Sequence, residues 1–158
     1  MKRKLKFGFF SFTGDEGCMM IFVEALNSRL AKWGKGMDIS YSKLLREKGN
    51  DMKGLDVAFV EGAITNEEEV KRIRAVRKAS KKLVAIGECA RTALPSAHRN
   101  AFAAKELAEI RPVLKKFNYL DKVYPLSKFV KVDYEVPGCP MEEAKFVALI
   151  ENFISKGI

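Results

Sequence analysis

The sequence has little of what marks several common protein classes. Among its 158 residues there are only three cysteines, one histidine and one tryptophan. Three cysteines are too few, and an odd number, for a disulfide framework. No apolar run approaches the roughly 18–20 residues of a transmembrane helix, and we find no internal repeat or low-complexity linker. These absences predict a single domain over residues 1–158 without membrane insertion.

Acidic residues are in the minority, and this charge balance bears on possible partners. There are 29 lysines and arginines against 20 aspartates and glutamates, a formal net charge of +9. The basic residues are spread over four stretches, residues 1–6, 71–82, 111–116 and 122–131. No nucleic-acid recognition motif accompanies them, so we interpret them as a solvated surface and expect no nucleic-acid partner. Docking of a basic face on an acidic protein remains an alternative.

The first residues resemble the charged start of a secretory signal. However, the apolar stretch 7–12 is short, contains Gly8 and Ser11, and runs into Thr13-Gly14-Asp15 without a cleavage site. We therefore interpret it as a first strand and expect the protein to stay in the cytoplasm, where free thiols persist.

Hydrophobic periodicity and chain-breaking residues predict strands that alternate with helices. The expected strands are residues 4–12, 38–42, 55–61, 82–87 and 129–136, and the expected helices are 18–33, 65–81, 105–117 and 141–155. Strand 55–61 is nearly all apolar, as expected of a strand covered on both faces. This order predicts a three-layer α/β domain around a mainly parallel sheet.

A capping box is predicted at the start of the second helix. The Thr65 hydroxyl can accept a hydrogen bond from the Glu68 N–H, and the Glu68 carboxylate can bond back. Three successive acids, at positions 67 to 69, also favour the positive end of the helix dipole.

Each cysteine follows the end of an expected strand. Cys18 comes one turn after strand 4–12, Cys89 directly after strand 82–87, and Cys139 just beyond strand 129–136. Ligands in open α/β sheets gather at the carboxyl ends of strands, so the three thiols should converge at one edge. Glycines that permit close backbone approach accompany them: Gly14, Gly17, Gly87 and Gly138. Thiolates in this setting suit an iron–sulfur cluster or zinc, although an isolated buried cysteine is often only a small hydrophobic residue.

A four-iron cluster needs a fourth ligand. Asp15 stands three residues before Cys18, where a C-x-x-C pair would have its first cysteine. Its carboxylate is a harder donor than a thiolate, and the alternative role is to accept hydrogen bonds at the start of the following helix. Glu16 and His98 are weaker candidates.

Several segments together resemble the small subunit of nickel–iron hydrogenases. They are Gly14-Asp15-Glu16-Gly17-Cys18, Asp56-Val57-Ala58-Phe59-Val60-Glu61-Gly62, Gly87-Glu88-Cys89-Ala90, Pro95-Ser96-Ala97-His98-Arg99-Asn100, Val130-Lys131-Val132-Asp133-Tyr134 and Pro137-Gly138-Cys139-Pro140. They occur in the family's order over nearly the whole chain. The chain is most similar to the short small subunits of soluble, bidirectional NAD(P)-linked hydrogenases. The 20-kilodalton subunit of respiratory complex I shares the fold but usually has adjacent cysteines where this chain has Gly17-Cys18.

The resemblance implies a flavodoxin-like domain that binds one proximal [4Fe–4S] cluster through Asp15, Cys18, Cys89 and Cys139. Aspartate departs from the family's cysteine and would alter the reduction potential, which makes a [3Fe–4S] form an alternative. Glu61 is similar to the family's glutamate near the cluster. Its alternative role is that of a strand-end acid that caps the next turn.

The resemblance also implies partners. The sequence ends at Ile158, has no later cysteine-rich region for further clusters, and contains no C-x-x-C pair such as the nickel site requires. The Ni–Fe centre is therefore expected on a large catalytic subunit. Electrons would pass on to a flavin- and nucleotide-binding subunit that serves NAD(P), F420 or a ferredoxin. The apolar surface around the cysteine loops is the expected interface.

Two other functions are compatible with parts of the sequence. Residues 11–16 resemble a flavodoxin phosphate loop for FMN, but two acids in that loop would repel phosphate. A structural or assembly subunit without a cluster is the second alternative, and three intact thiols argue against it.

Overall fold

The computed structural model describes residues 3–158. Its central sheet has five strands, all parallel, in the spatial order β2-β1-β3-β5-β7. These strands are β1 Leu5–Ser11, β2 Met37–Ser42, β3 Leu55–Glu61, β5 Ser80–Ile86 and β7 Tyr134–Val136. Counted within the sheet, this is the 2-1-3-4-5 order of flavodoxin-like folds. The predicted parallel sheet is confirmed.

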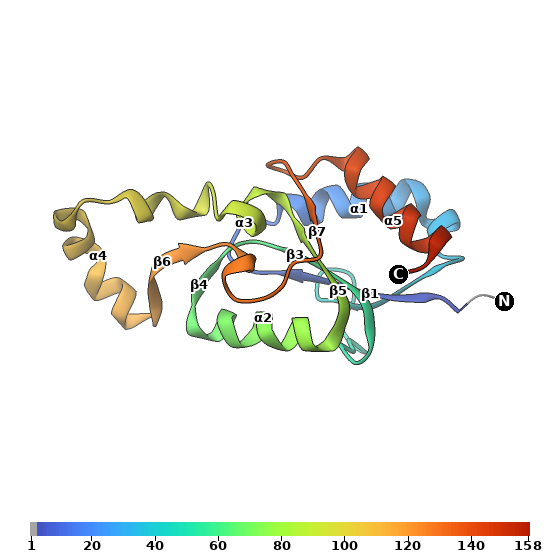
Figure 1. The fold of residues 1–158 in the computed structure, drawn as a ribbon, viewed down its shortest axis with the longest axis horizontal. Helices are drawn as coiled ribbons and strands as arrows, with labels where there is room; N and C mark the ends of the chain where they lie inside the picture. Colours follow the sequence, from blue (N-terminus) through green and yellow to red (C-terminus); the bar gives the residue numbers. More distant parts are fainter. Residues whose placement is uncertain (1–2) are drawn as a thin grey trace.

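Helices cover both faces of the sheet (Figure 1). Helices α1 (Gly17–Trp33) and α5 (Glu143–Lys156) lie together on one face, and α2 (Glu67–Ala79) lies on the other. Each connection between neighbouring parallel strands must cross the sheet, and a helix is the usual way to do so. The predicted three-layer α/β architecture is therefore confirmed.

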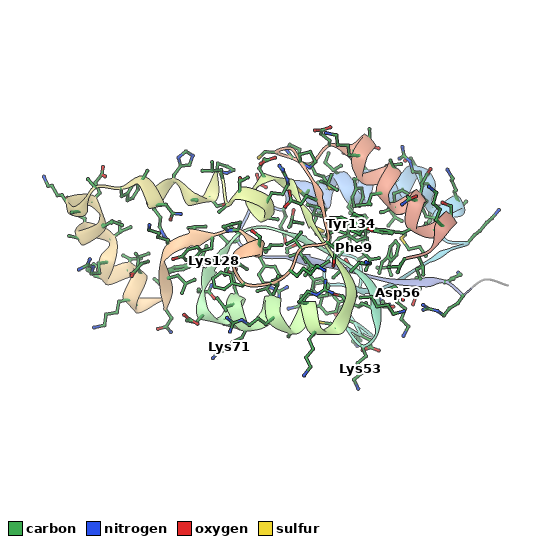
Figure 2. All side chains as sticks on the ribbon, viewed as in Figure 1. Phe9, Lys53, Asp56, Lys71, Lys128 and Tyr134 are labelled. Atoms are coloured by element: carbon green, nitrogen blue, oxygen red, sulfur yellow. The ribbon has the colours of Figure 1, made fainter. Side chains whose placement is uncertain are left out.

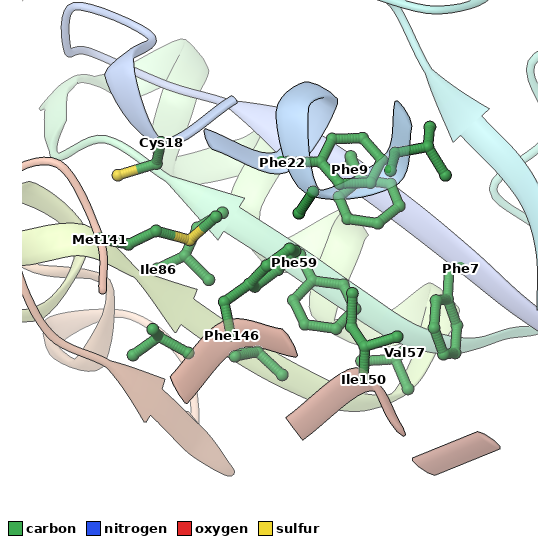
Figure 3. Close-up of a cluster of buried hydrophobic side chains, with 14 of the residues drawn as sticks. Phe7, Phe9, Cys18, Phe22, Val57, Phe59, Ile86, Met141, Phe146 and Ile150 are labelled. Carbon is green, nitrogen blue, oxygen red and sulfur yellow. The ribbon is translucent and has the colours of Figure 1, made fainter. Parts of the chain in front are cut away.

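An aromatic cluster fills the space between the sheet and helices α1 and α5 (Figure 3). The rings of Phe9 and Phe22 stack with centroids 3.7 Å apart, and Phe146 meets Phe59 edge-on at 5.4 Å. Each such pair contributes about 0.5–1.5 kcal/mol beyond the area that it buries. Cys18 lies at one end of this cluster, near Met141. The core thus reaches the carboxyl edge of the sheet.

Strand β3 is the centre of the sheet. All seven of its residues are buried, because aliphatic side chains under α2 cover the face opposite the aromatic cluster. The sequence prediction of a strand covered on both faces is confirmed. The carboxyl end of β3 is consequently held in place by both layers of helices.

The N-cap of helix α2 lies one residue later than the sequence predicts. Its N-cap is Asn66, whose side chain accepts a hydrogen bond from the Glu69 N–H at 2.8 Å. The Glu69 carboxylate in turn accepts from the Thr65 N–H at 2.8 Å. The predicted Thr65–Glu68 box is wrong, because Thr65 is still extended in the short strand β4 (Ile64–Asn66).

Residues 96–124 form an extension that we call the arm. It comprises a 3₁₀ turn (Ser96–Ala101), helix α4 (Ala104–Lys116) and strand β6 (Tyr119–Tyr124), which pairs antiparallel with β4. No residue of α4 is buried, and the helix projects from the body of the molecule (Figure 1). The predicted helix 105–117 is confirmed. The short helix α3 (Gly87–Thr92) and β6 were not predicted.

The last strand is shorter than predicted. The residues before Tyr134 include a 3₁₀ turn, Leu126–Lys128, and are not strand. The Asp133 carboxylate accepts from the Leu83 N–H at 2.9 Å and from Arg77 Nη1 at 2.7 Å, while the Asp133 N–H donates to the Leu83 carbonyl. A side chain thus replaces a backbone partner on β5, so regular pairing begins only at Tyr134.

Many basic side chains lie on the surface, as the charge pattern predicts. Lys53, Lys71 and Lys128 are exposed, and Lys53 and Lys71 point away from the body of the molecule (Figure 2). Within residues 3–158 no helix is both long enough and apolar enough to cross a bilayer.

Candidate metal centre

Three loops meet at the carboxyl edge of the sheet, and each carries a cysteine. We call residues 14–18, 87–89 and 138–140 the cysteine rim. The Glu88 N–H donates to the Gly138 carbonyl at 2.9 Å, and the Gly138 N–H donates to Glu88 Oε1 at 3.1 Å. These two bonds tie the start of α3 to the loop after β7. The loops that carry Cys89 and Cys139 are therefore held together.

Cys18 joins these two loops through Gly87. Gly87 has a φ of +80°, and a Cβ placed on it would overlap Cys18 Sγ. Only glycine combines this backbone conformation with so close a neighbour. Gly138, with a φ of +110°, is similarly restricted, since a Cβ there would lie 2.6 Å from the Pro140 carbonyl oxygen. The sequence prediction that glycines permit close approach fits the geometry at both positions.

The two glycines before Cys18 differ in how closely they approach neighbouring segments. A Cβ on Gly17 would lie 3.2 Å from Asp15 Oδ1 and 3.5 Å from Pro140 Cβ, so Gly17 lies between the first and third loops of the rim. A Cβ on Gly14 would make only an ordinary contact, with the Gly62 Cα at 3.5 Å. Gly14 thus faces the loop after β3, and the structure gives it no close approach to a cysteine.

The Cys18 thiol is buried among groups that disfavour its charge. Burial raises its pKa to about 12; a backbone hydrogen bond from Met141 works against this, and Glu61, Cys139 and Cys89 add to the increase. The three thiols are close enough to affect one another electrostatically. A thiolate here needs a compensating positive charge, which a bound metal would supply.

Cys139 is exposed at the outer side of the rim. Partial burial raises the pKa of its thiol first, and then the neighbouring Cys89, Asp15 and Glu88 raise it further. Cys89 Sγ lies 3.3 Å from the Ser96 hydroxyl. The charges of the three thiols thus affect one another, and that of Asp15 affects Cys139. Across residues 3–158 no three histidine, cysteine or acidic side chains are arranged to hold a single metal ion.

Asp15 fills the alternative role that the sequence allows. Its exposed carboxylate accepts a hydrogen bond from the Gly17 N–H through Oδ1 at 3.0 Å. Glu16 is the residue that precedes α1, with a left-handed φ of 60°. Asp15 therefore stabilises the turn before Cys18, and its second oxygen is not needed for that bond. The other weak candidate, His98, is exposed on the arm.

Glu61 ends strand β3 beneath the rim and is 3% exposed. Its Oε2 accepts from the Met19 N–H at 3.2 Å, whereas its buried Oε1 has no hydrogen-bond partner in the described part of the chain, residues 3–158. Burial raises its pKa, although the Ser11 hydroxyl and the Cys18 N–H favour the charged form. A buried carboxylate oxygen without a donor is costly and is a common mark of a functional position. The predicted location of Glu61 beside the cysteines agrees with this geometry.

Sequence reasoning missed four residues that organise the rim: Glu88, Arg91, Glu135 and Ser96. Glu88 accepts from Arg91 Nη1 at 2.6 Å, and Arg91 Nε donates to Glu135 Oε2 at 2.8 Å. Ser96 contacts Cys89, as described above. The Gly-Glu-Cys motif contained Glu88, but only the fold reveals that its carboxylate bridges two loops.

A protein-family model decides the relationship. The family described as NADH ubiquinone oxidoreductase, 20 Kd subunit, matches residues 16–153. The chain belongs to this family. The match includes all three cysteines and the whole of the sheet except β1.

Proteins similar to the chain include hydrogenase subunits. The chain is 28% identical to a subunit of the F420-non-reducing hydrogenase vhu of Methanocaldococcus jannaschii, a match that covers 86% of this chain and 51% of that protein. It is 25% identical to the delta subunit of NAD-reducing hydrogenase HoxS of Cupriavidus necator, over 96% and 79% of the two chains. It thus spans about half the length of the first relative and most of the second.

A solved structure agrees in fold. A chain of an NAD⁺-reducing [NiFe]-hydrogenase in the H2-reduced state superposes with a TM-score of 0.82 at 26% identity, covering 98% of this chain and 93% of that one. The predicted resemblance to hydrogenase small subunits is confirmed.

Proposed function

We propose that this family member is the electron-transferring small subunit of a [NiFe] hydrogenase. In this proposal Cys18, Cys89, Cys139 and Asp15 bind one iron–sulfur cluster at the cysteine rim, in a single domain over residues 1–158. The observation that carries the proposal is the convergence of three thiols from three separate loops on one edge of the sheet.

The rim has the chemistry that an iron–sulfur cluster needs. Three soft thiolate donors and one carboxylate supply four ligands. Each ligand of a cluster binds a different iron, so the four need not surround one ion. Gly87 and Gly138 keep the backbone open beside the thiols. The unpaired Glu61 Oε1 below them supports the presence of a further polar or cationic group.

When bound, the cluster would accept and donate single electrons, a chemistry that the side chains around it cannot supply. The chain's own residues hold the ligands. The Glu88–Gly138 bonds fix two loops, and the aromatic core supports the start of α1 below Cys18. Burial of Cys18 keeps solvent from one side of the site.

We infer that a large subunit with the Ni–Fe centre docks over the rim. Exposed apolar side chains flank it, Met20 with 56% of its surface accessible and Leu94 with 52%, and such residues mark interaction sites when they gather around a functional edge. The relatives' names support either an NAD-linked or an F420-non-reducing complex, in which a flavin- and nucleotide-binding subunit would receive the electrons. Free thiols support a cytoplasmic location.

The first test is the visible spectrum and iron content of the anaerobically purified full chain. We expect broad absorption that dithionite bleaches, and Cys89→Ala should lower iron content at least about twofold with the fold retained, because one ligand is lost. Ser96→Ala is the matched control, since it removes the neighbouring hydroxyl but leaves the thiol. Flavin bands would favour the FMN alternative. A colourless protein, with or without zinc, would contradict the proposal.

The second test concerns the fourth ligand. Asp15→Cys should convert the site to four thiolates and change the electron-spin resonance signal of the reduced protein, because thiolate and carboxylate ligands tune a cluster differently. Asp15→Asn keeps the size and the Gly17 contact while removing the charge. An unchanged signal in both variants would show that Asp15 only caps the turn.

A further inference from the structure

The arm contains a small basic pocket, away from the cysteine rim. It lies between the 3₁₀ turn, α4 and β6, and has a volume of about 170 Å³. Sites for whole small molecules usually measure roughly 300–1,000 Å³. The pocket therefore has room for one polar group or a small ion. Its charged lining consists of Arg99, Arg111, Lys122 and Asp121.

Arg99 is held at the base of the arm but is not fully paired. Its Nη2 donates to the Leu120 carbonyl at 2.7 Å, and its guanidinium lies 5.6 Å from the centroid of the Tyr119 ring. Among the described residues, 3–158, its buried Nε finds no hydrogen-bond partner. Burial lowers the pKa of Arg99, since the nearby Tyr119 and Asp121 compensate only in part. A charged donor in this state needs an acceptor.

The remaining charges do not provide that acceptor. Within residues 3–158 no carboxylate forms an ion pair shorter than 4.0 Å with Arg99, Arg111 or Lys122. Some other partly buried arginines do pair with carboxylates, as Arg77 does with Asp133 at 2.7 Å. Three cationic residues and one acid thus line the pocket, and the buried Nε of Arg99 beside it lacks an acceptor within residues 3–158.

We propose that this pocket binds one oxyanion, a phosphate or carboxylate group, between Arg99, Arg111 and Lys122. Guanidinium groups match the planar or tetrahedral oxygen pairs of such anions, and the lysine adds a point charge. The group can belong to a free phosphate-bearing molecule or to an acidic side chain of a partner protein. None of the lining residues is a proposed cluster ligand, and the inference does not depend on the proposed hydrogenase role.

The test is a titration of the ¹⁵N-labelled full chain, followed through arginine Nε–Hε resonances. Inorganic phosphate and N-acetylglutamate are added separately at low millimolar concentration, at constant ionic strength. We expect a saturable shift of one buried Nε–Hε signal with at least one of them. Preference for phosphate assigns a phosphate-bearing ligand, and preference for the glutamate derivative assigns a partner's carboxylate.

Variants make the result specific. Arg111→Gln should weaken binding about tenfold, and Lys122→Gln about threefold, because one charge-assisted contact is lost in each. Arg74→Gln is the control, since Arg74 is an exposed arginine of α2. No saturable shift with either anion would overturn the proposal, and so would equal weakening in Arg74→Gln, which indicates only general attraction to a basic surface.

Discussion

The two ends of strand β3 carry buried carboxylates in opposite conditions. At the amino end, Asp56 accepts hydrogen bonds from Arg3 at 2.8 and 2.9 Å, from Lys81 Nζ at 2.8 Å and from the Lys6 N–H at 2.9 Å. At the carboxyl end, Glu61 accepts one backbone bond and leaves an oxygen unpaired. The same strand thus has a satisfied acid at one edge and an unsatisfied one at the other.

The pKa values follow this difference. Burial alone would raise the pKa of Asp56, but the bonds from Arg3, Lys81 and the Lys6 N–H hold it well below its usual range. For Glu61 burial prevails and the pKa is raised. The amino edge is therefore arranged for stability, whereas the carboxyl edge retains an energetic cost. Such costs are found where a site serves function rather than stability.

The largest expected effect comes from paired glycine substitutions at the two edges. Gly54, before β3, has a φ of +66° with no atom within 4 Å of a Cβ, so Gly54→Ala should cost only the backbone strain, about 1–2 kcal/mol. Gly87→Ala adds overlap with Cys18 Sγ and should cost about 1–3 kcal/mol more. Urea unfolding of both variants measures the difference. Equal losses would mean that the rim can relax.

The second-largest expected effect is a loss of stability when the charge of Asp56 is removed. Asp56→Asn should lower the free energy of unfolding by about 2 kcal/mol at neutral pH, because charge-assisted bonds to Arg3 and Lys81 are lost. Urea unfolding at neutral pH measures this loss, and circular dichroism checks that the fold is retained. An unchanged free energy would show that solvent replaces these bonds at no cost.

The same variant has a pH signature. The folded-state pKa of Asp56 lies below the unfolded value of about 3.9, so its contribution is complete above that value and is lost as the pH falls towards the folded one. The difference in free energy of unfolding between wild type and Asp56→Asn should therefore become smaller at about pH 3. A gap that stays constant in acid would indicate loss of packing instead of charge.

The smallest expected effect is a gain in stability when the buried charge of Glu61 is removed. Glu61→Gln removes a buried charge without changing its size, so the iron-free chain should become about 1 kcal/mol more stable. Thermal unfolding beside Asp56→Asn gives the direct comparison. If Glu61→Gln destabilised the chain as much as Asp56→Asn, the two ends of β3 would be equivalent.

The cysteine rim was predictable because it depends on strand ends. Continuous apolar runs mark buried parallel strands, and the chain must leave each strand at the same edge of the sheet. Three cysteines after such runs therefore had to lie near one another. The sequence could not reveal the bridge from Glu88 to Gly138, because that contact joins residues 50 positions apart.

The secondary structure of the arm was less predictable, because it depends on contacts of individual side chains. Strand β6 has only Val123 buried, so no alternation of polar and apolar residues marks it. The Asn100 side chain instead bonds both the N–H and the carbonyl of Val123 at 2.8 Å. Thr65 was misassigned for a related reason, since pairing with β6 keeps β4 extended to Asn66. Local propensity does not contain such tertiary contacts.

The paired bonds between Glu88 and Gly138 also affect how the site could assemble. Because they couple the two loops, Cys89 and Cys139 are held relative to each other by the polypeptide alone, and Cys18 packs against Gly87 beside them. An incoming inorganic group would meet a binding site whose shape the polypeptide already determines. Folding of the chain would then come before its metallation.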